Sequence, residues 1–354
     1  MVNKLITEVL EKYNIDSTLV SYKTITHGYI NDTYLIFLEG EPKFVLQQLN
    51  TSIFKKVEML QQNIDRATSL LYNEQYSRLD FLRSSNGNTL VKYNDRYWRM
   101  MHYIPDSITF NTTNDECIAF EAGRIIGTFH RLLEKEATTA YHVTIPNFHD
   151  YKVRYKEFTS ALEIANAKVV SSAKDAIKFV NDNIEHFDTL EMSDLAIRIC
   201  HNDTKLNNIL FGADKKALCL IDLDTIMPGY FIYDFGDLVR TVVNPVEEDE
   251  KNLSKVKFNF NLFEKIVDGL HFSKMQLSDK ELEYLPIGVA LMPFLHGLRF
   301  LTDFLSGNIY YKVNYSDQNL DRCLSLFKFA TLAFKHQGQM KFYLKMKLNN
   351  KGTI

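Results

Sequence analysis

Polar side chains are concentrated in the segment HNDTKLNN, residues 201–208, directly after the apolar run LAIRIC. Asp203 and Asn208 are five residues apart, and Asp222 ends the apolar run LCLID fourteen residues after Asn208. This order matches a phosphoryl-transfer site, in which one aspartate accepts the proton of a hydroxyl group. The asparagine and the second aspartate would then supply the oxygen ligands that Mg2+ prefers. The alternative is a polar turn stabilised by Asp and Asn side chains, which explains neither the order nor the position of these residues.

The elements that precede this segment are predicted to form a small antiparallel sheet. Five short runs rich in β-branched and aromatic residues lie between residues 22 and 104, separated by turn-forming residues. They read YKTIT, TYLIFL, KFVLQQL, TLVKY and RYWRMMHYI. One helix interrupts them, because apolar residues recur at helical spacing in FKKVEMLQQNIDRATSLL. The residues predicted on its buried face are Val57, Leu60, Ile64, Ala67 and Leu71.

The periodicity changes to mostly helical from about residue 114 onward. The exception is the range 197–222, where IRIC, NILF and LCLID are short strand-like runs. We therefore expect an α+β protein with two lobes. The N-terminal, β-rich lobe would span residues 1–103, and the larger, mainly helical lobe would span residues 104–354, with the junction in MMHYIPDS.

Composition argues against several classes of partner. The formal net charge is −3, from 41 basic and 44 acidic residues, so no global positive field attracts nucleic acid or an anionic membrane. The run LPIGVALMPFLHGLRFL is interrupted by Pro293, His296 and Arg299 and is shorter than a membrane span. The N-terminal segment lacks the apolar stretch and cleavage signal of a secretory leader. We therefore expect a soluble, cytoplasmic protein without nucleic-acid or membrane partners.

The cysteines are scattered and form neither a C-x-x-C pair nor a dense disulfide framework. We interpret all four as reduced thiols in the core: Cys117, Cys200, Cys219 and Cys323.

The segment HNDTKLNNILF, together with CLIDLDT, resembles the catalytic core of the aminoglycoside phosphotransferase and choline kinase superfamily, whose members are related to protein kinases. Further segments resemble the N-acetylhexosamine 1-kinase branch, in which ATP phosphorylates the anomeric hydroxyl of free GlcNAc or GalNAc. These segments are GYINDTYLI, FVLQQLNTSIFK, IPNFHDYKVRY, DLDTIMPGYFIYDFGDLVR and GLRFLTDFLSGNIYYKV. The resemblance extends over about residues 20–340 and implies a bilobal, protein-kinase-like fold.

The resemblance also implies roles for the residues of the polar segment. Asp203 would be the catalytic base, Asn208 and Asp222 the magnesium ligands, and His201 a structural member of the loop. Lys205 lies two residues after the base, where protein kinases also place a lysine facing the transferred phosphate. The alternative for Lys205 is an ordinary exposed lysine.

A second pattern, YDFGD at residues 233–237, spells the D-F-G of protein kinases. We do not interpret Asp234 as the metal ligand, because a suitable aspartate already ends the preceding strand. Asp234 and Asp237 are instead expected to cap the following helix or to hydrogen-bond the catalytic loop. Asp224 could contact the metal, the sugar or neither. Asn202 and Asn207 are interpreted only as turn formers.

The ATP side carries a weaker signal. The segment THGYINDTY would cover the phosphates, but a single glycine is a poor glycine-rich loop, and by itself the segment indicates only a hairpin. The residues that we predict to contact nucleotide there are Gly28, Tyr29, Asn31 and Thr33. The strand that carries the phosphate-binding lysine in protein kinases reads FVLQQL here, so Gln47 or Gln48 occupies the position of that lysine. In protein kinases this lysine pairs with a glutamate on a helix, and Glu58 is the possible partner here by its position alone.

The adenine is expected against the backbone of Met101 to Tyr103, as in relatives. Trp98 and Met100 are interpreted as core residues. The missing lysine leaves two alternatives. Either the N-acetylhexosamine 1-kinase branch positions ATP with an amide and neutralises its charge with Mg2+ and Lys205, or this chain is a weak or inactive kinase.

For the acceptor, the resemblance implies that Arg299 and Tyr310 hydrogen-bond the hydroxyl or acetamido groups of a sugar. An arginine in this pocket would repel a polycationic aminoglycoside or a quaternary ammonium and would suit neutral polyols. The alternative for Arg299 is an ion pair with Asp303 four residues later.

Another segment, FHDYKVRY, offers His149, Asp150 and Arg154, which either line the same cavity or pin a loop.

We therefore predict an ATP- and Mg2+-dependent kinase for the C1 hydroxyl of an N-acetylhexosamine. Three rivals stay open: a kinase of the same fold for another sugar, an amino alcohol or an aminoglycoside; a protein kinase; and a nucleotide-binding module without turnover. A protein kinase is disfavoured because the segment after Asp222 is short and lacks an A-P-E signal.

Overall fold

The N-terminal part of the computed structural model is a five-stranded antiparallel sheet with the strand order β1-β2-β3-β5-β4. The structure describes residues 4–16, 18, 20–25 and 30–348. The strands are β1 Val20–Ile25, β2 Asp32–Leu38, β3 Glu41–Leu49, β4 Leu90–Tyr93 and β5 Arg96–His102. Each of the five predicted runs thus forms a strand. Because β5 ends at His102, we propose that the boundary between the lobes lies between residues 103 and 104.

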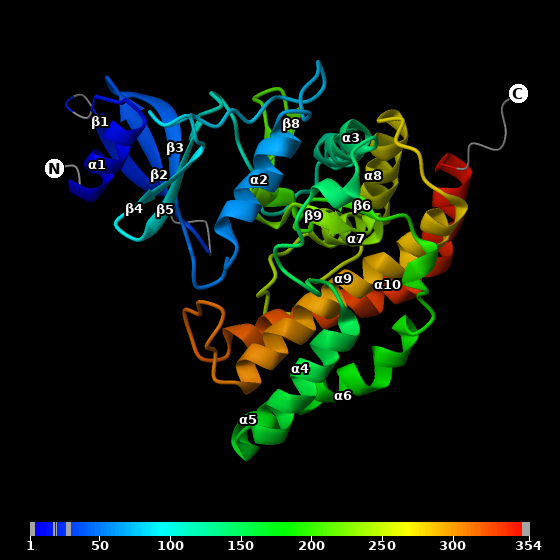
Figure 1. The fold of residues 1–354 in the computed structure, drawn as a ribbon. Helices are drawn as coiled ribbons and strands as arrows, with labels where there is room; N and C mark the ends of the chain where they lie inside the picture. The colour runs from blue at the N-terminus through cyan, green and yellow to red at the C-terminus, as the bar shows by residue number, and fades with distance from the viewer. Residues whose placement is uncertain (1–3, 17, 19, 26–29, 349–354) are drawn as a thin grey trace, which may run out of the picture.

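The remaining chain is mainly helical, and it adds two pairs of short strands, β6 with β9 and β7 with β8 (Figure 1). These strands are β6 Arg198–Cys200, β7 Ile209–Phe211, β8 Ala217–Leu220 and β9 Met227–Gly229. The helices of the whole chain are α1 Lys4–Lys12, α2 Val57–Thr68, α3 Glu116–Leu133, α4 Tyr151–Ile164, α5 Ala167–Ser172, α6 Lys174–Asn183, α7 Phe231–Val242, α8 Phe260–Phe272, α9 Asp279–Leu305 and α10 Gln318–Leu348. The expected division into a β-rich N-terminal part and a larger helical part is confirmed.

The sheet has a hydrophobic core of its own, shared with α1. Trp98 and Met100 are fully buried in it, and the ring of Trp98 stacks on Tyr34 at 6.4 Å between ring centroids. Both residues are therefore core residues, as predicted. Their neighbour Arg99 lies between them in sequence, and alternation along a strand directs its side chain to the opposite face of the sheet.

Helix α2 packs with the helical part instead of the sheet core. Its five predicted apolar residues are each no more than 2% exposed, and they belong to the large core formed with α3 and α7. Figure 1 shows α2 between the sheet and the helices. A buried amide fixes it there: Asn63 donates to the carbonyls of His142 and Ile226, at 2.8 and 2.9 Å, and accepts from His142 N at 2.8 Å.

The long helix α9 differs from the sequence prediction. Pro286 and Pro293 lie inside a continuous helix of 27 residues, a continuity that the sequence analysis did not address. Helices α7 and α10 pack against α9, so burial of its apolar side chains offsets the hydrogen bonds that the prolines remove. Among the described residues, α9 is the one helix long and apolar enough to cross a membrane, but 78% of its most apolar window is buried inside the protein.

The cysteine prediction holds for three positions. Cys200, Cys219 and Cys323 are buried, whereas Cys117 is exposed near the start of α3, so the prediction of a core thiol was wrong there. All four are free thiols.

Helices α3 and α8 cross closely because glycines line their contact. A Cβ atom built on Gly269 of α8 would lie 1.9 Å from the carbonyl oxygen of Phe120, and one built on Gly123 of α3 would lie 2.0 Å from that of Ile266. The contact atoms are backbone and cannot move aside by a side-chain rotation. This crossing therefore requires glycine at both positions.

We expect Gly269→Ala to lower the free energy of unfolding by about 1–3 kcal/mol, the usual effect of overpacking a tight core. Gly338→Ala is the matched control, because Gly338 is an exposed residue of α10 and the added methyl group would have nothing within 4 Å. There the same substitution should stabilise by about 0.5–1 kcal/mol through helix propensity. Urea unfolding measures the free energy of unfolding of both variants. An equal change in the two variants would contradict the close crossing of α3 and α8.

Candidate active site

The segment predicted to be catalytic follows β6 and ends in a short 3-10 turn, η5 Leu206–Asn208, that leads into β7. Asp203 is half-buried in this loop, and its Oδ2 atom accepts from Lys205 Nζ and from Asn208 Nδ2, both at 2.9 Å. Burial alone would raise the pKa of Asp203, but the adjacent Lys205 ammonium holds that pKa below its usual value. The carboxylate is therefore ionised and fixed in position at neutral pH.

Asn208 and Asp222 are brought together by the pairing of β7 with β8, in which Ile221 N donates to the Asn208 carbonyl at 2.8 Å. The Asn208 amide nitrogen donates to Asp203, which leaves the amide oxygen as the ligand atom of this side chain. Asp222 has a left-handed backbone conformation, with φ 61°, and its side chain is exposed. Desolvation by the surrounding protein and the nearby Asp224 raise the pKa of Asp222 to about 6.

These oxygen donors fit a divalent cation. Asp203, Asp222 and Asp224 place three carboxylates near one another, as their mutual influence on the pKa of Asp222 indicates. A hard cation between carboxylate and amide oxygens would relieve this repulsion. The assignment of Asn208 and Asp222 as the residues that would hold it stays a prediction.

His201 is fully buried below the loop, and its hydrogen bonds define its tautomer. Nε2 donates to the Ile221 carbonyl at 2.8 Å, and Nδ1 accepts from Asp203 N at 3.2 Å. The neutral ring with its proton on Nε2 satisfies both bonds. His201 therefore connects the predicted base to the strand that ends at the predicted metal ligand, a geometry that supports a structural role.

Asp234 lies in the first turn of α7 and binds the catalytic loop from below. Its Oδ2 atom accepts from His201 N and His130 Nε2, both at 2.9 Å, and Oδ1 accepts from Asn202 N at 2.7 Å. Its carbonyl also accepts from Thr204 Oγ1 at 2.6 Å. Asp234 is fully buried, and both carboxylate oxygens are engaged. It therefore hydrogen-bonds the catalytic loop, as expected, and these bonds support a structural role for Asp234.

Asp237 does not bind the loop and does not cap α7, because the helix begins six residues earlier at Phe231. Its Oδ1 atom accepts from Arg240 Nε at 2.7 Å and lies 3.1 Å from His296 Nε2. Although burial raises its pKa, the Arg240 guanidinium and His296 hold the pKa of Asp237 well below the usual range. Asp237 thus anchors Arg240 and His296 at the wall of the cavity described below.

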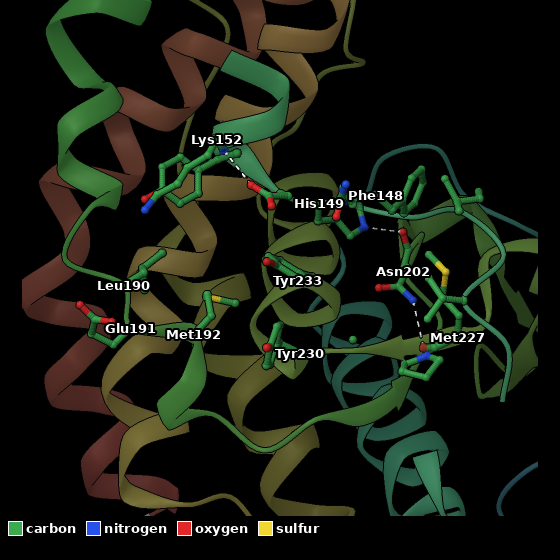
Figure 2. Close-up of a pocket in the computed structure, with 17 residues that line it drawn as sticks. Phe148, His149, Lys152, Leu190, Glu191, Met192, Asn202, Met227, Tyr230 and Tyr233 are labelled. Carbon is green, nitrogen blue, oxygen red and sulfur yellow. Dashed lines mark hydrogen bonds between the residues drawn. The ribbon is translucent and has the colours of Figure 1, made fainter. Parts of the chain in front are cut away.

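The other side of the catalytic loop is supported by His149. Its Nε2 atom donates to the Asn202 carbonyl at 3.0 Å, and Asn202 itself donates to the carbonyls of Thr225 and Met227. Figure 2 shows the bonds from His149 to Asn202 and from Asn202 to Met227 at the wall of a rear cavity, which has a volume of about 430 Å³. Burial lowers the pKa of His149 to about 3, so it is a neutral donor at physiological pH. Asn202 therefore braces the loop and does more than form a turn.

The neighbouring residues of the same segment pin the chain. Asp150 caps the N-terminus of α4 by accepting from Lys152 N and Val153 N, and Arg154 binds Glu157 and the Asn147 carbonyl. Arg154 also lies at the edge of the surface that includes Arg299 and Tyr310.

A second cavity, the front cavity, has a volume of about 250 Å³ and opens beside Asp203 and Lys205. Arg299 of α9 lies in its wall, where the guanidinium packs 5.0 Å from the ring centre of Phe148 and 6.0 Å from that of Tyr311. The predicted alternative, an ion pair with Asp303, does not form. Asp303 instead accepts from Tyr310 N and Tyr311 N, at 2.8 and 3.0 Å. Among the described residues, Arg299 has no carboxylate partner.

Tyr310 lies in the same wall and is 51% exposed. Asp224 lies elsewhere: it does not line the front cavity, and Asn31 Nδ2 donates to its Oδ2 atom at 2.6 Å. Its other oxygen forms an ion pair with Arg99 Nη1 at 2.5 Å. Asp224 therefore faces the predicted nucleotide side, and this position gives no support to a contact with the acceptor.

The nucleotide side is described only in part, because Gly28 and Tyr29 lie outside the described residues. Thr33 and Gln47 are adjacent, since Gln47 Nε2 donates to Thr33 Oγ1 at 3.3 Å. Glu58 does not reach Gln47, because its carboxylate accepts from Tyr97 Oη on β5 at 2.5 Å.

At the predicted adenine position, two backbone amides are already used. His102 N donates to the Asp80 carbonyl and Tyr103 N donates to the Lys43 carbonyl, both at 2.9 Å. The carbonyl of Met101 faces its partner Val45 across β3 and β5. An adenine at this segment would therefore have to pair with backbone groups other than the amides of His102 and Tyr103.

Comparison with known proteins agrees with this geometry. Residues 21–252 match the model of the phosphotransferase enzyme family. The fold is similar to a microcompartment-associated aminopropanol kinase, with a TM-score of 0.64 and 15% identity over 96% of this chain and 99% of that one. It is also similar to an amicoumacin kinase in complex with AMP-PNP and Ca2+ (TM-score 0.61, 12% identity, 97% and 94% covered) and to a choline kinase from Cryptosporidium parvum (TM-score 0.58, 13% identity, 98% and 99% covered).

The match covers more than half of the chain, so this chain belongs to the phosphotransferase enzyme family. It is therefore a phosphotransferase, and it shares its fold with solved aminopropanol, amicoumacin and choline kinases.

Proposed function

We propose that this protein transfers the γ-phosphoryl group of MgATP to the anomeric C1 hydroxyl of an N-acetylhexosamine. The observation that carries this proposal is the front cavity, where an arginine without a carboxylate partner faces the same space as Asp203. Its volume of about 250 Å³ is small beside the roughly 300–1,000 Å³ of most ligand cavities. That size favours one sugar ring over an aminoglycoside of several rings. A cytoplasmic location, where ATP is supplied, is part of the proposal.

The proposed mechanism depends on positioning and charge. Asp203 accepts the proton of the C1 hydroxyl as the oxygen attacks the γ-phosphorus, and the bond to the ADP oxygen breaks on the opposite side. Lys205, held 2.9 Å from Asp203, offsets the negative charge beside the transferred group. Asn208 and Asp222 would hold Mg2+, which neutralises charge on the nucleotide phosphates when bound. The acceptor is oriented by Arg299 and Tyr310.

A second candidate is an amino-alcohol kinase. Glu247, Glu248 and Asp249 also line the front cavity. Glu248 is paired with Arg240, whereas the side chains of Glu247 and Asp249 accept, among the described residues, only from the neutral amides of Asn111 and Gln318. Their charge would attract an ammonium group, as aromatic rings in the same cavity also would.

An acceptor screen separates the candidates. We expect ATP consumption with GlcNAc or GalNAc, and none above background with choline, ethanolamine, aminopropanol or kanamycin. Turnover with an amino alcohol alone would reject the sugar proposal in favour of the second candidate. MgATP binding without turnover on any acceptor would identify a nucleotide-binding module.

Arg299→Met should raise the KM for the sugar about 10-fold or more, the effect of removing one hydrogen bond to a charged donor. The KM for ATP should stay unchanged, because Arg299 lies on the acceptor side. Arg83→Met is the matched control, since this exposed arginine donates only to the Gly87 carbonyl. An equal rise in both KM values would argue that Arg299 supports the fold and does not bind the acceptor.

A further inference from the structure

The position of the usual phosphate-binding lysine is occupied by Gln47 of β3, and a cation stands directly beside it on the neighbouring strand. Gln47 pairs with Arg99 of β5 across the antiparallel sheet. We propose that Arg99 is the phosphate-binding cation of the nucleotide site, supplied by β5 in place of the missing β3 lysine. This inference rests on the proposed use of MgATP and adds a nucleotide-binding residue to it.

The first argument is orientation. Residues directly opposite each other in an antiparallel pair direct their side chains to the same face. Arg99 Nε donates to Gln47 Oε1 at 2.9 Å, and the Gln47 amide is held in turn by Thr33 at 3.3 Å. Gln47 therefore aims the guanidinium toward the side of the sheet where the lysine of a protein kinase would extend. A neutral amide suits this task because its oxygen accepts from Arg99 without neutralising the positive charge of the guanidinium.

The second argument is proximity to the predicted metal site. Arg99 is 1% exposed, and its Nη1 atom forms an ion pair with Asp224, two residues after the predicted ligand Asp222. Asn31, which precedes β2, binds the second oxygen of Asp224. Asp224 is thus held by the loop before β2 and by β5. The guanidinium therefore lies in direct contact with the segment that carries the predicted metal ligand.

The third argument is an unused donor. Nε of Arg99 is bound to Gln47 and Nη1 to Asp224, while Nη2 has no hydrogen-bond partner among the described residues. A planar guanidinium can bind a carboxylate with one edge and a phosphate with another. Arg99 can therefore keep Asp224 in place and contact a phosphate oxygen at the same time.

The test measures nucleotide binding by calorimetry with the full-length protein. Arg99→Met should weaken MgADP binding about 10- to 100-fold, the loss expected for one charge-assisted hydrogen bond. Adenosine, which has no phosphate, should compete equally well for both proteins. Arg96→Met is the matched control, because this arginine of the same strand is exposed and donates to Gln48, and it should bind MgADP as the wild type does.

Removing Arg99 alone leaves the buried Asp224 unpaired, so the same substitution is also made in an Asp224→Asn background, where no charge is left unpaired. A 10-fold or greater loss of MgADP affinity in this background supports the proposal. No further loss there would overturn it, because Arg99 would then serve only to neutralise Asp224. An equal loss for adenosine and MgADP would overturn it too. If the wild-type protein bound no nucleotide, the proposed function itself would fail.

Discussion

Asp203→Asn is expected to lower kcat by about 10²- to 10⁴-fold, the usual contribution of a general base. Binding of MgATP should stay close to that of the wild type. The amide keeps the shape of the carboxylate and can still accept from Lys205, so the loop should fold as before. The substitution removes only the group that can take up the hydroxyl proton.

Steady-state kinetics with the accepted sugar and calorimetry with MgATP measure the two quantities separately. Asp182→Asn is the control, because this exposed aspartate of α6 pairs only with Lys178. Its kcat should equal that of the wild type. Undiminished turnover of Asp203→Asn would reject the assignment of the base.

Asp234→Ala is expected to lower the free energy of unfolding by at least about 3 kcal/mol. The substitution leaves the backbone amides of His201 and Asn202 and the His130 ring without an acceptor in a fully buried position. Each buried donor left unsatisfied costs about 1–3 kcal/mol. The catalytic loop would lose its support, and turnover would fall with stability.

Urea unfolding checks this effect against Asp214→Ala, an exposed aspartate whose charge pairs only with Lys216. Asp222→Asn provides the contrast: asparagine tolerates the left-handed backbone at this exposed position, so stability should stay near that of the wild type. Its MgATP binding should instead lose its dependence on magnesium. If Asp234→Ala folded normally and lost the metal requirement, the D-F-G interpretation would be restored.

Much of the fold could be predicted from the sequence because its periodicities are strong. Runs rich in β-branched and aromatic residues, bounded by turn formers, predicted all five strands of the sheet, and the recurrence of Val57, Leu60 and Ile64 predicted α2. The continuity of α9 through Pro286 and Pro293 could not be predicted, since it depends on packing against other helices. That packing is a property of the tertiary structure.

The site was predictable where its residues are close in sequence. Asp203, Lys205 and Asn208 lie on one loop, and their hydrogen bonds follow from that spacing. Arg99 was missed, because it lies 52 residues after Gln47 and its relation to the lysine position depends on which strands pair. The available signal was a charged residue between the buried Trp98 and Met100.

The buried amide of Asn63 has a consequence for regulation. Protein kinases are switched by moving the helix that corresponds in position to α2. Here that motion would break three hydrogen bonds of a residue that is 1% exposed, and it would detach the helix from Ile226, just beyond the predicted metal segment. These bonds oppose the use of α2 as a switch. We expect a constitutive enzyme, whose output in the cell follows the supply of its substrates.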